Sequence, residues 1–293
     1  MSLFTAWKNE VFYQGACLEQ HWMILDGALI ERLEPELIRL FCLQDAKLQH
    51  FNLFSCSRWH ELHEIAPVLI SYHPDIERWA QQQSAWRFGL IFKSNVDMEM
   101  LINFWQNLMA CEPQGLEGAL ARLFDPVVFK HLLDSTTLER QQAWLGPIEE
   151  LWLPDVVHEH YWHGIPQQLK ADLECSNTGS IFTDQEWQGL SDAARFYTEL
   201  RLLAHMEKFY PHRLPTGRVA KHQWVSVHLQ ELIELGASDE RSAKRYLNII
   251  GRLGDLRDEN SKYSEIAKLL KRGAGPLSVR LAEADFLSRQ YAH

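Results

Sequence analysis

The chain has 293 residues, of which 46% are hydrophobic and 23% charged, and these proportions exclude a disordered protein. Its charge is uneven. Residues 1–165 carry 11 Lys and Arg against 22 Asp and Glu, a net of −11, whereas residues 166–293 carry 18 against 17, a net of +1. An acidic N-terminal part repels nucleic-acid phosphate and anionic lipid, so it favours a neutral or basic protein partner.

The N-terminal sequence and the cysteines indicate a cytoplasmic protein. Residues 1–12 (MSLFTAWKNEVF) lack a basic start followed by an apolar stretch, so no signal peptide is predicted. No apolar run approaches the roughly 20 residues of a membrane span. The five Cys are odd in number and form no C-x-x-C pair, which argues against a disulfide framework or a cysteine zinc site.

Up to about residue 163, short apolar runs alternate with helical patterns, which predicts a sheet covered by helices. The predicted strands lie at 22–29, 48–54, 67–72, 88–93, 119–124, 148–153 and 156–162. The predicted helices lie at 35–43, 75–83, 98–110, 126–133 and 138–144. Because most connections contain a helix, we expect parallel and antiparallel pairs in one mixed sheet.

Three aspartates mark the ends of these elements. Asp97 and Asp125 precede helical runs as N-caps, and Pro126 takes the first helical position after Asp125. Asp26 precedes Gly27 and is predicted to form a turn at the end of its strand. Asp26 and Asp125 follow strands, where α/β enzymes often place catalytic groups. Their neighbours predict structural roles instead.

Residues 164–180 are polar and contain Pro166 and the run CSNTGS, which predicts a linker. We assign an α/β domain to 1–165, the linker to 166–181 and a helical domain to 182–293. Thr183 and Glu186 stand at capping-box spacing and begin a helix that runs to about Tyr210. Further helices are predicted at 221–235, 238–251, 264–271 and 277–291. The predicted fold is therefore an α/β N-terminal lobe, with a mixed sheet covered by helices, followed by an all-α C-terminal lobe.

The search for catalytic motifs finds no G-x-x-x-x-G-K-[ST], G-x-G-x-x-G, H-E-x-x-H or G-x-S-x-G. Two histidine clusters stand out, WHELHE at 59–64 and HEHYWH at 158–163. On a strand, His158 and His160 would share a face, as a pair of zinc ligands does, but zinc needs three or four convergent ligands. We predict no catalytic residue, cofactor or metal. A metal-dependent hydrolase using His158 and His160 is the alternative.

Four segments carry a resemblance to a known family. They are WMILDGAL at 22–29, APVLI at 66–70, RLFDPVVF at 122–129 and LGPIEELWLP at 145–154. In this order they resemble a type VI secretion effector adaptor-chaperone family, first catalogued as a domain of unknown function and encoded beside spike and effector genes. The third segment departs from the family, because Val127 stands where the family usually has an arginine.

The resemblance implies a bacterial adaptor that binds the N-terminal segment of a toxic effector and assists its loading onto the spike-tip protein. It implies no enzymatic activity, and the expected partners include neither nucleic acid nor membrane. Trp and Tyr are favoured anchors at protein interfaces, so Trp152, Tyr161 and Trp162, near the junction of the two lobes, are the predicted partner-binding residues. A second alternative is a regulator that binds nucleic acid through the helical lobe, although its basic residues are scattered.

Overall fold

The computed structural model describes residues 5–8, 20–42, 48–84, 87–111, 120–158, 161–165, 182–237, 239–256 and 263–291. The chain divides into two compact units, Met1–Ala193 and Ala194–His293. The division falls inside one long helix, α6 (Asp184–Phe209), so residues 184–193 belong to the N-terminal unit. The predicted linker at 166–181 lies outside the described residues.

The N-terminal unit is built on a seven-stranded sheet with the order β1-β7-β6-β5-β2-β4-β3. The strands are β1 (Thr5–Lys8), β2 (His21–Leu25), β3 (His50–Asn52), β4 (Val68–Ser71), β5 (Gly89–Lys93), β6 (Glu150–Pro154) and β7 (Tyr161–Ile165). Every described pair is antiparallel, so the expected mixture of parallel and antiparallel pairs is wrong. The strand order explains the error. Because β4 and β5 both pair with β2, the helix between them, α2 (Pro74–Ser84), passes over a strand instead of joining neighbours.

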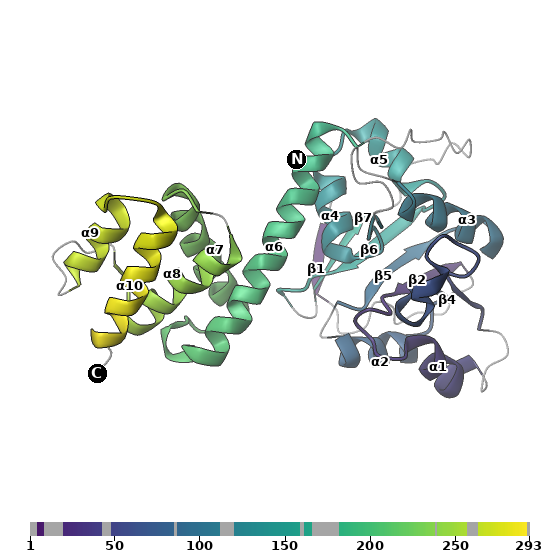
Figure 1. Cartoon of the computed structure of the whole chain (residues 1–293). Helices are drawn as coiled ribbons and strands as arrows, with labels where there is room; N and C mark the ends of the chain where they lie inside the picture. The colour runs from purple at the N-terminus through teal and green to yellow at the C-terminus, as the bar shows by residue number, and fades with distance from the viewer. Residues whose placement is uncertain are drawn as a thin grey trace. The chain divides into compact units, whose positions relative to one another are not determined.

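Helices cover both faces of the sheet (Figure 1). One face packs against α3 (Met98–Met109), α4 (Pro126–Asp134) and α5 (Leu138–Leu145). The other face packs against α1 (Leu33–Leu37) and α2. Alternation along β2 shows the arrangement: Trp22 and Ile24 join the first core, and Met23 and Leu25 join the second. The predicted sheet covered by helices is confirmed.

The start signals of the helices behave as predicted at two positions. The Asp97 side chain accepts a hydrogen bond from Met100 N at 2.8 Å, and Asp125 accepts from Val127 N at 3.0 Å. Both carboxylates therefore satisfy amides that a helix start leaves without partners. The helix predicted at 35–43 is α1 followed by a π-helical turn, η1 (Ile38–Cys42).

Two predicted strands differ from the structure. In the segment predicted at 119–124, the described residues 120–124 form loop and turn, and Asp125 N donates to the carbonyl of Arg122 at 2.9 Å across that turn. The second strand of the predicted hairpin begins at Tyr161 instead of Val156. The chain turns first, because the Asp155 carboxylate accepts from the amides of Val157 and His158.

The C-terminal unit is all-α among its described residues, as predicted. It contains the rest of α6, η3 (Pro211–Arg213), α7 (Arg218–Glu234), α8 (Glu240–Leu253), α9 (Ser264–Arg272) and α10 (Leu277–Tyr291). Leu202, Leu229, Leu247 and Leu281 lie in its core. None of the helices in the described part of the chain has the length and apolar character that a membrane crossing requires.

Candidate functional site

Two residues of the second histidine cluster, His158 and His163, contact the same aspartate in the β6–β7 connection. His158 lies in the loop between β6 and β7, with its Nδ1 3.0 Å from Asp155 Oδ2, and the Nε2 of His163 lies 3.1 Å from the same oxygen. The other Asp155 oxygen accepts the amides of Val157 and His158 at 2.9 and 2.8 Å. Burial opposes ionisation of Asp155, but the bonds from His163 and these amides hold its pKa well below the usual range.

This geometry differs from the zinc pair considered from the sequence. His158 is not on a strand, and His160 and Glu159 lie outside the described residues. Among the residues that the structure describes, no group of three or more His, Cys, Asp and Glu could hold a metal ion. Nδ1 of His158 and Nε2 of His163 both contact the Asp155 carboxylate. The cluster therefore fastens the β6–β7 connection.

The three predicted partner-binding aromatics lie on adjacent strands with different exposure. Trp162 is fully buried on β7, 6.0 Å from Phe88 between ring centroids. Trp152 on β6 is also buried, and it stacks on His21 at 5.8 Å. Tyr161 is half-buried and contacts the ring of His158. Both tryptophans belong to the core beneath α1 and α2, so only Tyr161 presents surface to a partner.

Three of the four resemblance segments meet at the end of β2. The buried Asp26 carboxylate pairs with the Arg122 guanidinium and accepts Ala28 N at 3.0 Å. Burial raises the pKa of Asp26, and the Arg122 charge partly offsets that rise. A Cβ on Gly27 would lie 2.2 Å from the carbonyl oxygen of Ala66, so only glycine allows this close approach.

These contacts give a structural role to the polar residues of the four segments. Asp26, Gly27 and Arg122 join the turn after β2 to the segment that precedes α4, while the neighbouring Asp125 caps α4. The fourth segment is held to the sheet by Ser94 Oγ, which donates to the carbonyl of Pro147 at 2.7 Å. Asp26, Arg122 and Asp125 of these segments thus bind one another or the backbone.

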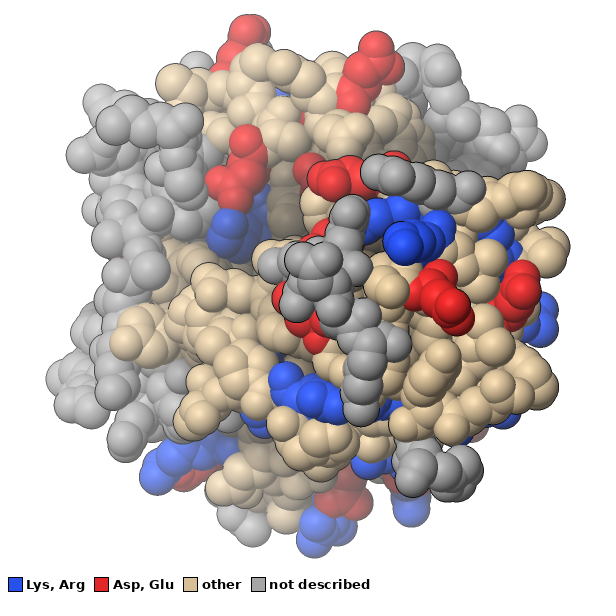
Figure 2. Space-filling model, turned by 90° about the vertical axis from the view of Figure 1, so that its left-hand side faces the viewer, with Lys and Arg blue, Asp and Glu red and all other residues tan. Residues whose placement is uncertain are grey.

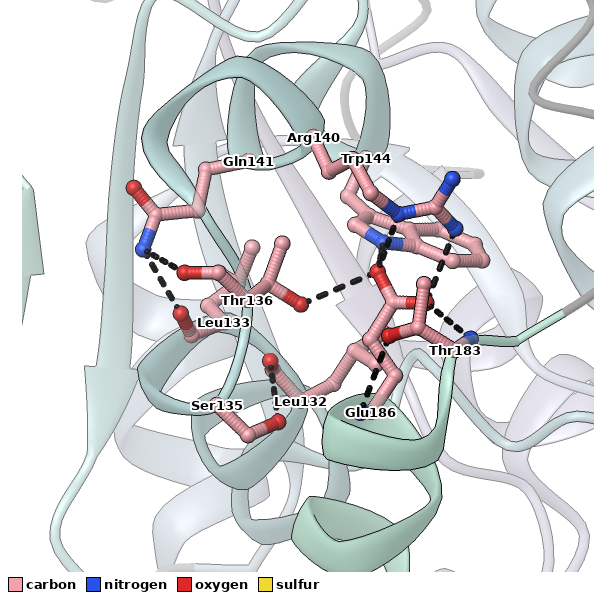
Figure 3. Close-up of polar contacts among 9 residues, drawn as sticks. All are labelled: Leu132, Leu133, Ser135, Thr136, Arg140, Gln141, Trp144, Thr183 and Glu186. Carbon is pink, nitrogen blue, oxygen red and sulfur yellow. Dashed lines mark hydrogen bonds and ion pairs between the residues drawn. The ribbon is translucent and has the colours of Figure 1, made fainter.

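The carboxylate drawn in Figure 3 belongs to Glu186, in the first turn of α6. Its side chain has no exposed surface. Oε1 accepts from Arg140 Nε at 2.7 Å, Trp144 Nε1 at 2.7 Å and Thr136 Oγ1 at 3.1 Å. Oε2 accepts from Arg140 Nη2 and Thr183 N, both at 2.8 Å. Thr183 Oγ1 in turn accepts Glu186 N at 3.3 Å, which completes the predicted capping box.

The Glu186 cluster fastens the start of α6 to α5 and to the residues before it. Burial opposes ionisation, but the donors Arg140, Thr183 and Trp144 lower the pKa of Glu186 to about 2, so it is an anion at neutral pH. The spacing of Thr183 and Glu186 revealed the capping box. No sequence signal identified Arg140 or Trp144 as partners, because they lie more than 40 residues away.

Comparison with known proteins finds a family match in the N-terminal part of the chain. Residues 21–143 match the family Domain of unknown function (DUF4123). The match includes the Asp26 turn, Arg122 and the Asp125 cap, and it ends inside α5. The Glu186 cluster therefore joins the start of α6, which follows the matched residues, to the end of the matched segment.

The similarity to one relative extends through both units. The chain is 24% identical over 282 residues to accessory protein VasW of Vibrio cholerae serotype O1. The aligned region covers 94% of this chain and 89% of VasW. No solved structure matches the chain. Together with the DUF4123 match, this confirms the resemblance to the adaptor family that the four segments indicated.

Proposed function

We propose that the protein is an adaptor-chaperone of type VI secretion. It binds the N-terminal region of a toxic effector in the bacterial cytoplasm and assists loading onto the spike-tip protein, without catalysing a reaction. The observation that carries this proposal is the DUF4123 match, followed by a helical unit that shares similarity with an accessory protein.

The contacts of the acidic side chains support a binding role over a catalytic one. Asp26, Asp125, Asp155 and Glu186 are held by backbone amides or by basic side chains of the same chain. A general acid or base needs a carboxylate that can reach a substrate. These four stabilise turns, helix starts and loops instead.

The charge distribution on one face of the molecule supports a protein partner rather than nucleic acid. Figure 2 views the molecule from the side on which α8, α9 and α10 lie in Figure 1. On this face Lys and Arg are interspersed with Asp and Glu, and large areas carry neither. A phosphate-binding surface requires clustered basic side chains. The nucleic-acid alternative gains no support from this face.

The test is co-expression of the tagged chain with the effector encoded beside its gene, in a full-length form and in a form lacking its N-terminal region. The full-length effector should be recovered in a stable complex, and the truncated form should be lost. Equal recovery of both forms would contradict the mechanism. If neither form is recovered and the purified chain carries one metal ion that depends on His158 and His160, the hydrolase alternative replaces it.

A further inference from the structure

The first histidine cluster, WHELHE, lies in an exposed segment with no role in the contacts described so far. It forms most of η2 (His60–Ile65), a 3₁₀ segment in which all six residues are exposed. Leu62 and Ile65 remain 46% and 48% exposed. α1 packs beside η2, and Ile38, directly after α1, is 37% exposed. We call the exposed residues Ile38, Leu62, Ile65, Glu31, Glu61 and Glu64, on and beside these two contacting elements, the α1–η2 surface.

The α1–η2 surface concentrates apolar exposure. Five large hydrophobic side chains are exposed among the described residues of the N-terminal unit, and three of them belong to this surface. The other two, Met100 and Leu138, lie in the first turns of α3 and α5. Single exposed hydrophobics are ordinary, whereas grouped ones mark interaction sites.

The backbone beneath these side chains is held firmly. Trp59, just before η2, is buried and packs on Phe54 with ring centroids 5.8 Å apart. Asn52 Nδ2 donates to the carbonyl of His63 at 3.0 Å. At the far end, the missing Cβ of Gly27 allows close packing on the Ile65–Ala66 backbone. A partner would therefore meet a preorganised surface and lose little entropy in ordering it.

The charges on the surface indicate the chemistry of the partner. Glu31, Glu61 and Glu64 form no ion pair or hydrogen bond through their side chains within the described structure, unlike Glu36, which pairs with Arg39 at 2.6 Å. Arg32, directly before α1, is exposed, and, after the hydrogen bond from Arg39, its charge helps to lower the pKa of Glu36. Three carboxylates and one guanidinium leave a net charge of −2 around the apolar side chains, in a domain region whose net charge is −11.

We infer that the α1–η2 surface docks a basic amphipathic helix of a protein partner. Aliphatic side chains of that helix pack on Ile38, Leu62 and Ile65, and its flanking Lys or Arg face Glu61 and Glu64. A helix with aliphatics at i, i+3 and i+4 presents such a stripe between basic residues. A second copy of this chain does not fit, because a two-fold contact would place these carboxylates against themselves.

This inference rests on the proposed function for the source of the helix, the N-terminal region of the effector. The direct test uses a synthetic amphipathic peptide of about 18 Leu and Lys residues, long enough to form a helix, and a Leu and Glu counterpart. Binding to the full chain is measured by isothermal titration calorimetry at low salt. The Lys peptide should bind the wild type, and the Glu peptide should not.

Four double variants locate the contact. Leu62→Ser with Ile65→Ser, and Glu61→Lys with Glu64→Lys, should each weaken binding of the Lys peptide about tenfold or more. The matched controls, Met100→Ser with Leu138→Ser and Glu99→Lys with Glu139→Lys, should stay within about twofold of the wild type. All four should keep the wild-type melting temperature, because each site is exposed. Wild-type binding by the surface variants, or equal losses in the controls, would overturn the inference.

The same variants separate this inference from the proposed function. If the wild type captures the effector and the α1–η2 variants capture it equally well, the adaptor function stands and its location here is wrong. If neither the wild type nor any variant captures the effector, but the Lys peptide binds the wild type and loses affinity for the α1–η2 variants, the adaptor function fails and the basic-helix site stands.

Discussion

Glu186→Gln is expected to destabilise the N-terminal unit by about 3 kcal/mol at neutral pH. Glutamine has the same size as glutamate but carries no charge. Its amide nitrogen, which cannot accept a hydrogen bond, takes the place of one of the two carboxylate oxygens. If that nitrogen takes the Oε2 position, Arg140 Nη2 and Thr183 N, both now at 2.8 Å from Oε2, lose their acceptor. A hydrogen bond to a charged group contributes about 1.5–3 kcal/mol. Breaking a buried ion pair costs about 3–5 kcal/mol. Because the Arg140 side chain is 31% exposed, water replaces part of the lost hydrogen bonding, so the expected loss of stability lies near the lower end of that range.

Urea unfolding followed by circular dichroism measures the change, with Glu99→Gln as the control. Glu99 lies in the first turn of α3, as Glu186 lies in the first turn of α6, but it is exposed. Because the chain has two compact units, two transitions are possible, and the loss should appear in the transition of the N-terminal unit. Glu99→Gln should change the stability by less than about 0.5 kcal/mol.

The pH dependence gives an independent check. The folded pKa of Glu186 is about 2, below the value near 4.3 of an unfolded glutamate. Its stabilisation is therefore complete above that unfolded value and is lost as the pH falls through the folded one. The difference between wild type and Glu186→Gln should be constant near neutrality and shrink between about pH 4.5 and 2. A difference below about 1 kcal/mol at pH 7, or one unchanged by acid, would refute the reasoning.

Four further predictions address the cap, two aromatic residues and the domain boundary. Asp125→Ala should cost about 0.5–2 kcal/mol of stability, measured by thermal unfolding, and should leave effector capture at low temperature intact; unchanged stability with loss of a chemical activity would contradict the structural role. Trp162→Ala should cost about 3–5 kcal/mol because the side chain is fully buried. Tyr161→Ala should weaken effector capture, by about 2 kcal/mol or more if Tyr161 is an anchor, without lowering the melting temperature; unaltered capture would remove Tyr161 from the interface. Limited proteolysis should cut first between residues 164 and 182, and first cuts within 22–154 would contradict the two-domain assignment.

Local patterns in the sequence determined most of the elements. Asp97, Asp125 and the Thr183–Glu186 box mark helix starts through bonds between residues two or three apart. The apolar runs placed most strands because burial follows side-chain type. The resemblance segments likewise identified the adaptor family, since they form the turn at Asp26 and the start of α4. Each of these features depends on near neighbours, so one stretch of sequence is sufficient to predict it.

The tertiary structure decided what depends on distant partners. The antiparallel sheet follows from β2 lying between β4 and β5, an order that no local pattern specifies. The burial of Trp162 follows from its packing beside Phe88, more than 70 residues earlier. Arg140 became the partner of Glu186 only when folding brought α5 against the start of α6. Such contacts depend on how whole elements pack together. The same residue types occur on exposed and on buried helix faces, so the local sequence does not show which distant element a side chain will meet.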